Sequence, residues 1–257
     1  MPIELPEPDR ARLQGSPLAL VVCQLRFEEV PGTSEGRAGL RLQQELEAGA
    51  YQAIERMQSQ DLALQLGPGG VQPAIENPKN GWRLMTGDRR WTVAILPDGA
   101  TLETQRYETW LDYRARLVDL FHAVTTVLEP ATVSRLGLRY VDKISRADIQ
   151  EPAGWRPYIA SSLLGPILDE GFGPGILAAQ QQIDLDAGNG ARCTLRHGTL
   201  RESDAALGYI LDIDAYYDGL RPFDFDALTE QADLLNTVSL QVFQRATSLE
   251  LLETLGS

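Results

Sequence analysis

Four aspartates occupy two short segments in which each aspartate follows an apolar residue, Ile-Asp-Leu-Asp and Leu-Asp-Ile-Asp. They are Asp184, Asp186, Asp212 and Asp214. Side chains of a β-strand alternate between its two faces, so both aspartates of one segment lie on the same face. If the two strands share a sheet, the four carboxylates could hold Mg²⁺ or Mn²⁺ against a nucleotide or phosphate ester. One hypothesis is therefore a metal-dependent phosphoryl-transfer enzyme.

The same alternation is also the ordinary pattern of a strand that buries one face and exposes the other to water. Two glycine-rich segments, Gly67–Gly70 and Gly171–Gly175, match neither the phosphate-binding loop nor the dinucleotide-binding fingerprint. We therefore prefer the solvated-face interpretation. We expect no cofactor, and no metal unless the enzyme hypothesis holds.

Arginines also fall in predicted strands, at Arg26, Arg139, Arg192 and Arg196. A guanidinium group binds carboxylates and phosphates through paired hydrogen bonds. In the interpretation that we prefer, these arginines pair with the aspartates across neighbouring strands. In the other, Arg26 and Arg139 bind a small anion on a concave sheet, as a sensor would.

The cysteines and histidines point to no further chemistry. Cys23 and Cys193 lie too far apart in the sequence for a zinc knuckle, and we expect each to be a small buried residue. His122 falls inside a predicted helix, as a packing or surface residue. His197 and Cys193 are separated by about 13 Å along an extended strand, which is too far for a catalytic Cys–His pair.

Composition excludes several classes of partner. The chain has 23 lysines and arginines against 36 aspartates and glutamates, which gives a net charge of −13. General binding to nucleic acid or to an anionic membrane requires positive charge, so neither is expected. No stretch approaches the roughly 20 apolar residues of a membrane helix. The acidic N-terminus does not resemble a secretory signal, and we expect a cytoplasmic protein.

The elements that position these residues follow from periodicity and turn chemistry. Residues 1–16 are rich in proline and acidic residues, which predicts a flexible lead-in. Period-two patterns predict strands at Leu18–Phe27, Leu62–Leu66, Trp82–Thr86, Trp91–Leu96, Thr101–Tyr107, Val133–Ile144, Leu177–Asp186, Ala191–Leu200 and Leu207–Tyr217. Helical spacing predicts helices at Leu42–Met57, Thr109–Leu128, Trp155–Leu168 and Asp224–Thr247.

The order of these elements predicts an internal duplication. Leu25-Arg26-Phe27 in the first strand of one half echoes Leu138-Arg139-Tyr140 in the first strand of the other. The repeated unit would be a strand, a helix, an antiparallel meander and a closing helix. We predict an α+β fold whose halves, 17–130 and 131–257, join into one compact domain. A curved antiparallel sheet would carry the helices on one face.

Three segments carry a resemblance to known sequences: Ser16–Phe27, Arg135–Ile144 and the C-terminal run Leu235–Phe243 with Thr247 and Leu252–Gly256. In these segments the chain resembles an uncharacterised, sporadically distributed family of bacterial proteins of about this length. The family has no settled activity, so the resemblance supplies no catalytic residue. It implies an accessory role, for example in a defence or conflict system.

These observations together predict a non-catalytic interaction protein. The negative charge suits a basic protein partner, such as a toxin or effector neutralised by an antitoxin or immunity protein. Tyr216 and Tyr217, at the end of a predicted strand, are the expected exposed contact with that partner. The metal-dependent enzyme and the small-anion sensor are the alternatives.

Overall fold

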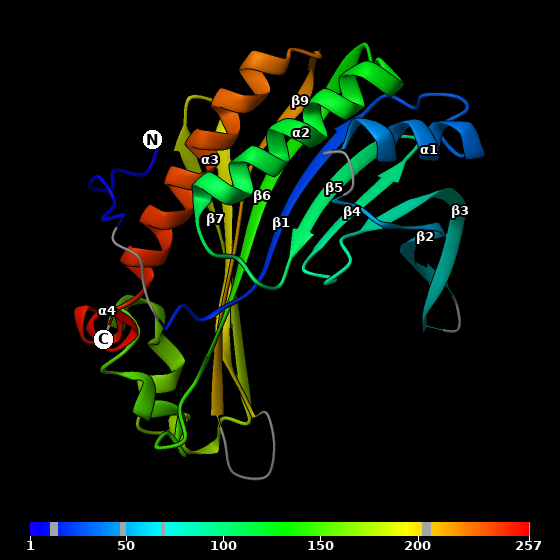
Figure 1. Cartoon of the computed structure of the whole chain (residues 1–257). Helices are drawn as coiled ribbons and strands as arrows, with labels where there is room; N and C mark the ends of the chain where they lie inside the picture. Colours follow the sequence, from blue (N-terminus) through cyan, green and yellow to red (C-terminus); the bar gives the residue numbers. More distant parts are fainter. Residues whose placement is uncertain (11–14, 47–49, 68–69, 202–206, 257) are drawn as a thin grey trace.

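The computed structural model describes residues 1–10, 15–46, 50–67, 70–201 and 207–256 (Figure 1). Within these residues, nine antiparallel strands form one open sheet in the order β2-β3-β4-β5-β1-β6-β9-β8-β7. The strands are β1 (Leu18–Phe27), β2 (Ala53–Gly67), β3 (Gly70–Met85), β4 (Trp91–Leu96), β5 (Gly99–Thr104), β6 (Thr132–Ser145), β7 (Ala178–Gly188), β8 (Ala191–Arg201) and β9 (Leu207–Pro222). The α-helices are α1 (Gly36–Glu45), α2 (Trp110–Leu128), α3 (Phe225–Ala246) and α4 (Leu249–Gly256). The predicted α+β class is confirmed.

The first strands of the two predicted halves lie side by side inside the sheet. β1 pairs with β6 in a register that sets Gln24 opposite Gly137. On its other side, each of these strands pairs with the last strand of its own half, β5 or β9. The remaining strands continue outward as hairpins. The two segments therefore contribute adjacent blocks to one continuous sheet.

Helices α2 and α3 lie across one face of the sheet (Figure 1). In β1, Val21, Cys23 and Leu25 are buried on this helix-covered face, whereas Arg26 is exposed on the opposite one, which we call the open face. Cys193 is also buried, and burial raises the pKa of its thiol to about 12. Both cysteines therefore pack as core residues, as predicted.

The helix predicted over Leu42–Met57 is wrong in its second half. Helix α1 ends at Glu45, and β2 begins at Ala53. A few apolar residues at helical spacing fit either element, and the partner strand decides between them. Ile54 lies opposite Leu84 in a long β2–β3 hairpin that satisfies the backbone hydrogen bonds.

The helix predicted over Trp155–Leu168 is also wrong. Between Pro152 and Gly175 the chain instead forms four short 3₁₀ helices, at Pro152–Trp155, Ser161–Leu163, Gly165–Leu168 and Gly173–Gly175. Prolines such as Pro157 and Pro166 lack the N–H that an α-helix needs, so the turns stay short. The segment nevertheless buries Trp155, whose indole N–H donates to Thr199 Oγ1 at 3.2 Å.

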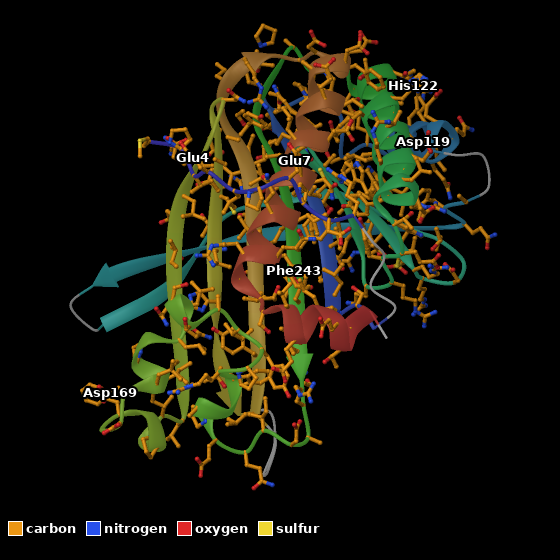
Figure 2. The ribbon with its side chains drawn as sticks, turned by 90° about the vertical axis from the view of Figure 1, so that its left-hand side faces the viewer. Glu4, Glu7, Asp119, His122, Asp169 and Phe243 are labelled. Atoms are coloured by element: carbon orange, nitrogen blue, oxygen red, sulfur yellow. The ribbon has the colours of Figure 1, made fainter. Side chains whose placement is uncertain are left out.

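Residues 1–10, which we call the N-terminal strap, run past β7 and α3 (Figure 2). The Ile3 N–H donates to the carbonyl of Asp186 in β7 at 2.8 Å. From α3, Gln241 Nε2 donates to the carbonyl of Pro6 at 2.9 Å. The flexibility predicted for residues 1–16 stays a prediction. No helix among the described residues is long and apolar enough to cross a membrane.

Candidate functional site

The four predicted aspartates lie on the open face, but they do not converge. β7 and β9 carry two each, and β8 separates these strands. Asp184 accepts hydrogen bonds from Thr194 Oγ1 at 2.7 Å and from Gln182 Nε2, and these bonds lower the pKa of its carboxyl. Asp186 accepts the N–H of Gly188 at 3.0 Å at the end of its strand. The β7 carboxylates are therefore satisfied locally.

The β9 carboxylates are held by arginines of neighbouring strands. Arg139 of β6 binds Asp212 through two hydrogen bonds of 2.6 and 2.8 Å. Arg196 of β8 approaches Asp212 from the other side at 3.6 Å. Arg135 of β6 binds Asp214 at 3.0 Å. The preferred prediction, a ladder of cross-strand ion pairs, is confirmed for Arg139 and Arg196.

Burial and the neighbouring arginines shift the pKa of Asp214 in opposite directions. Burial raises its pKa, and the charges of Arg135, Arg139 and Arg196 oppose the rise. Among the described residues, no three His, Cys, Asp or Glu side chains are grouped so that they could hold a metal ion. The groups at the β9 aspartates are arginines, whose positive charge opposes the binding of Mg²⁺ or Mn²⁺.

The other predicted site residues are scattered. Arg26 lies exposed on the open face, opposite Arg135 in the β1–β6 register, and forms no ion pair with a described residue. Arg135 stacks over the Tyr216 ring, with its guanidinium carbon 4.1 Å from the ring centroid. Tyr217 is 9% exposed on the helix-covered face, so the prediction that both tyrosines are exposed is wrong for this residue. The alternation of a strand places two consecutive residues on opposite faces.

The two histidines differ in burial. His122 is exposed on α2 (Figure 2). His197 is 2% exposed on the helix-covered face, with Nδ1 2.8 Å from the hydroxyl of Tyr209. Its Nε2 is buried and has no hydrogen-bond partner among the described residues. Burial lowers the pKa of this imidazole, because removal from water penalises the charged form.

A cavity of about 340 Å³ opens on the helix-covered face. Its walls come from the start of β1, from β6 and β9, from the segment that leads into α2, from α3 and from the strap. Most of the lining is apolar and aromatic. The rings are Tyr107, Trp110, Tyr140 and Phe243, of which Figure 2 labels the last on α3. A mainly apolar cavity of this size is typical of a small-molecule site.

One carboxyl group lines this cavity without a partner. Asp142 of β6 is 2% exposed, and its carboxyl faces the cavity without a hydrogen bond or an ion pair to another described residue. Burial raises the pKa of this carboxyl from 3.8 to about 8, because removal from water penalises the charged form. Asp142 is therefore mostly protonated at neutral pH in the unliganded protein.

Three other polar residues of the cavity, Arg10, Tyr140 and Asn236, are joined in one hydrogen-bond network. Asn236 Nδ2 donates to the hydroxyl of Tyr140 at 2.8 Å. Arg10 Nη1, from the strap, donates to Asn236 Oδ1 at 3.1 Å, and its Nη2 donates to Thr237 Oγ1 at 2.7 Å. These bonds hold the strap against α3 and fix the orientation of the Asn236 amide. Asp142 is not part of this network.

Sequence reasoning did not select Asp142 as a site residue. A signal was present in β6, where Leu136, Leu138, Tyr140 and Ile144 share the buried face with Asp142. An aspartate that interrupts an otherwise apolar strand face is a candidate functional group, because burial of a carboxyl is costly. The cavity itself could not be predicted, since its walls come from segments that are far apart in the chain.

Comparison with known proteins does not identify this chain. It matches no protein-family model and no curated protein. The resemblance to an uncharacterised bacterial family therefore stays a prediction.

Proposed function

We propose that this protein is a non-catalytic binding protein whose cavity between the sheet and α3 holds a small, largely apolar molecule with one polar group. The observation that carries the proposal is the buried carboxyl of Asp142, which lines the cavity and has no hydrogen-bond partner among the described residues. A bound molecule with a matching polar group would supply the missing partner.

Packing alone gives no reason for an aspartate at this position. Its neighbours on the same face of β6, Tyr140 and Ile144, are buried, and a leucine would continue the apolar surface. A buried polar group without a partner destabilises a fold by roughly 1–3 kcal/mol, and a charged one by more. Groups that reduce stability in this way concentrate at functional sites.

The test measures whether an apolar probe enters the cavity. N-phenyl-1-naphthylamine fluoresces strongly in apolar surroundings and is small enough for a cavity of about 340 Å³. Leu240→Trp would fill the cavity from α3, because Leu240 lines it. Leu234→Trp is the matched control, since Leu234 lies on the same helix and is 48% exposed.

We expect saturable fluorescence enhancement with the wild type and with Leu234→Trp, and its loss with Leu240→Trp. Circular dichroism would establish that both variants are folded. No enhancement with the wild type, or an enhancement that Leu240→Trp leaves unchanged, would contradict a cavity that binds small molecules.

The predicted basic protein partner is the second proposal, and the charge distribution favours a particular surface for it. On the open face, the aspartates of β9 are already paired with arginines. Exposed acidic residues instead follow the strap and the helices beside it, with Glu4 and Glu7 labelled in Figure 2. Glu230, Glu250 and Glu253 continue this charge on α3 and α4. A basic surface would be attracted there.

A charge-reversal comparison tests this second proposal. The tagged protein would be purified from its native host at normal expression, and co-eluting proteins would be identified by mass spectrometry. We expect a stoichiometric basic protein that Glu4→Lys with Glu7→Lys releases, and that the open-face pair Asp184→Asn with Asp186→Asn retains. A partner that is lost only with the open-face pair would contradict the acidic strap as its site.

The two alternatives from the sequence receive less support. The enzyme hypothesis needs carboxylates that converge, and Asp212 is instead bound by Arg139. The anion sensor needs Arg26 and Arg139 together, but Arg139 is paired and Arg26 lies on β1, beside Arg135.

The predicted duplication is a further proposal. It is supported by the sheet order, in which each half places its first strand at the centre and pairs it with its own last strand. The echoed segments, Leu25–Phe27 and Leu138–Tyr140, lie on these two central strands. The halves differ after the first strand, where one has α1 and the other has 3₁₀ helices. The test is to superpose the backbone of Leu18–Leu128 on that of Thr132–Ala246. If the best superposition does not bring the two echoed segments onto each other, the duplication is contradicted.

A further inference from the structure

We propose that the polar group of the ligand is an organic ammonium ion, which binds between Asp142 and the aromatic rings of the cavity. This inference rests on the proposed function and names the chemical class of the ligand. Two features of the cavity carry it: the carboxyl that lacks a partner among the described residues and the aromatic rings that line the same space.

The aromatic lining favours a cation. The faces of tyrosine, tryptophan and phenylalanine rings carry negative electrostatic potential, and they attract ammonium groups most strongly where water is excluded. Tyr107 and Tyr140 meet edge to face, with ring centroids 5.8 Å apart. Trp110 is fixed by its indole N–H, which donates to Asp233 Oδ1 at 2.8 Å. These rings are therefore held in place before any ligand arrives.

The other charged residues that line the cavity have partners, whereas the carboxyl of Asp142 has no opposite charge beside it. From the strap, Arg10 lines the cavity and directs its guanidinium to Asn236 and Thr237. From the segment before α2, Glu108 is bound by Arg90 at 2.5 Å. Of the described residues that line the cavity, those from α3, β1 and β9 carry no charge, and Tyr107 and Tyr140 are neutral phenols whose pKa burial raises.

An ammonium ion explains an aspartate better than a neutral ligand does. A neutral hydrogen-bonding ligand could be recognised by asparagine, serine or threonine, which do not suffer the burial penalty of a carboxylate. A cation in contact with the carboxylate compensates its charge and restores the ionised form. The residue type at position 142 therefore indicates the charge of the ligand.

Ionisation of Asp142 also makes the binding affinity depend on pH. Because the pKa of Asp142 is about 8 in the free protein, binding of an ammonium ion at neutral pH releases a proton. The affinity for a permanently protonated amine should then rise about tenfold per pH unit between pH 6 and pH 7. A neutral ligand of the same shape should show no such increase.

The experiment compares 1-naphthylmethylamine with 1-naphthalenemethanol, which differ in charge and little in shape. Each would compete with N-phenyl-1-naphthylamine for the wild type, for Asp142→Asn and for Asp184→Asn, the matched open-face control. We expect the amine to bind the wild type and Asp184→Asn at least tenfold more tightly than the alcohol. Asp142→Asn should lose this preference. Calorimetry in two buffers of different ionisation enthalpy would detect the released proton.

The outcomes separate the ligand class from the function. If the alcohol competes as well as the amine, or if the affinity for the amine does not change between pH 6 and pH 7, the ammonium proposal is overturned and a neutral ligand takes its place. If the naphthyl probe itself fails to bind the wild type, the cavity is not a ligand site, and the proposed function is overturned together with the inference.

Discussion

Replacement of Asp142 by asparagine should stabilise the unliganded protein, by an amount that grows with pH. Burial raises the pKa of this carboxyl from its ordinary value of 3.8 to about 8. Because the pKa is higher in the folded state, protonation of Asp142 favours folding. This contribution to stability is fully present below pH 4 and is lost as the pH rises through 8. Relative to low pH, this rise in pKa lowers the free energy of unfolding by about 6 kcal/mol above pH 8, and by about 4 kcal/mol at pH 7. Asparagine has nearly the same shape and cannot ionise.

Urea unfolding of the wild type and of Asp142→Asn between pH 4 and pH 9 would measure this difference. Near pH 4 the folded proteins carry a neutral side chain at this position, and the two free energies of unfolding should agree within about 1 kcal/mol. The advantage of the variant should then increase by about 1.4 kcal/mol per pH unit up to pH 8. A difference that does not change between pH 5 and pH 9, or a variant that is less stable at pH 9, would refute the assignment of Asp142 as a buried carboxyl without a partner.

Three further predictions concern the ion-pair ladder, the buried histidine and the close approach of two strands. Arg139→Ala should lower the free energy of unfolding by about 1–3 kcal/mol, because it leaves the largely buried carboxylate of Asp212 with only the more distant Arg196 as its ionic partner. Arg26→Ala, at an exposed position, should change this free energy by less than about 0.5 kcal/mol. Equal effects in urea unfolding would contradict the ladder. The pKa of His197 is lowered, so its contribution to stability is present above pH 6.5 and is lost as the pH falls below it. An NMR titration of its ring signals should give a pKa below 6.5, and a pKa at or above this value would contradict the burial of the ring. Gly198→Ala would place a Cβ against a carbonyl oxygen of β7 and should lower the melting temperature by several degrees. Gly175→Ala, at a position with open space around it, should leave the melting temperature unchanged. Similar melting temperatures for the two variants would contradict the close approach of β7 and β8.

Local patterns in the sequence were sufficient for several elements. The strands at Leu18–Phe27 and Trp91–Leu96 agree with the structure to the residue, because alternating apolar residues end at clear turn signals. Asn189 and Gly190, two residue types that are typical of a hairpin turn, join β7 and β8, and both have the positive φ that this turn requires. The sequence also placed the aspartates of each segment on one face of a strand. These properties depend on a few neighbouring residues.

Other properties depend on which segments meet, and only the tertiary structure decided them. The β2–β3 hairpin makes Ala53–Met57 a strand, although its apolar spacing also suits a helix. The order of β6, β9, β8 and β7 turns the predicted carboxylate cluster into a ladder of ion pairs. The cavity at Asp142 exists because the strap, α3 and the segment before α2 enclose one position of β6. The sequence by itself determined where an acid interrupts an apolar face, and the packing of distant segments decided that this acid lines a cavity with aromatic walls.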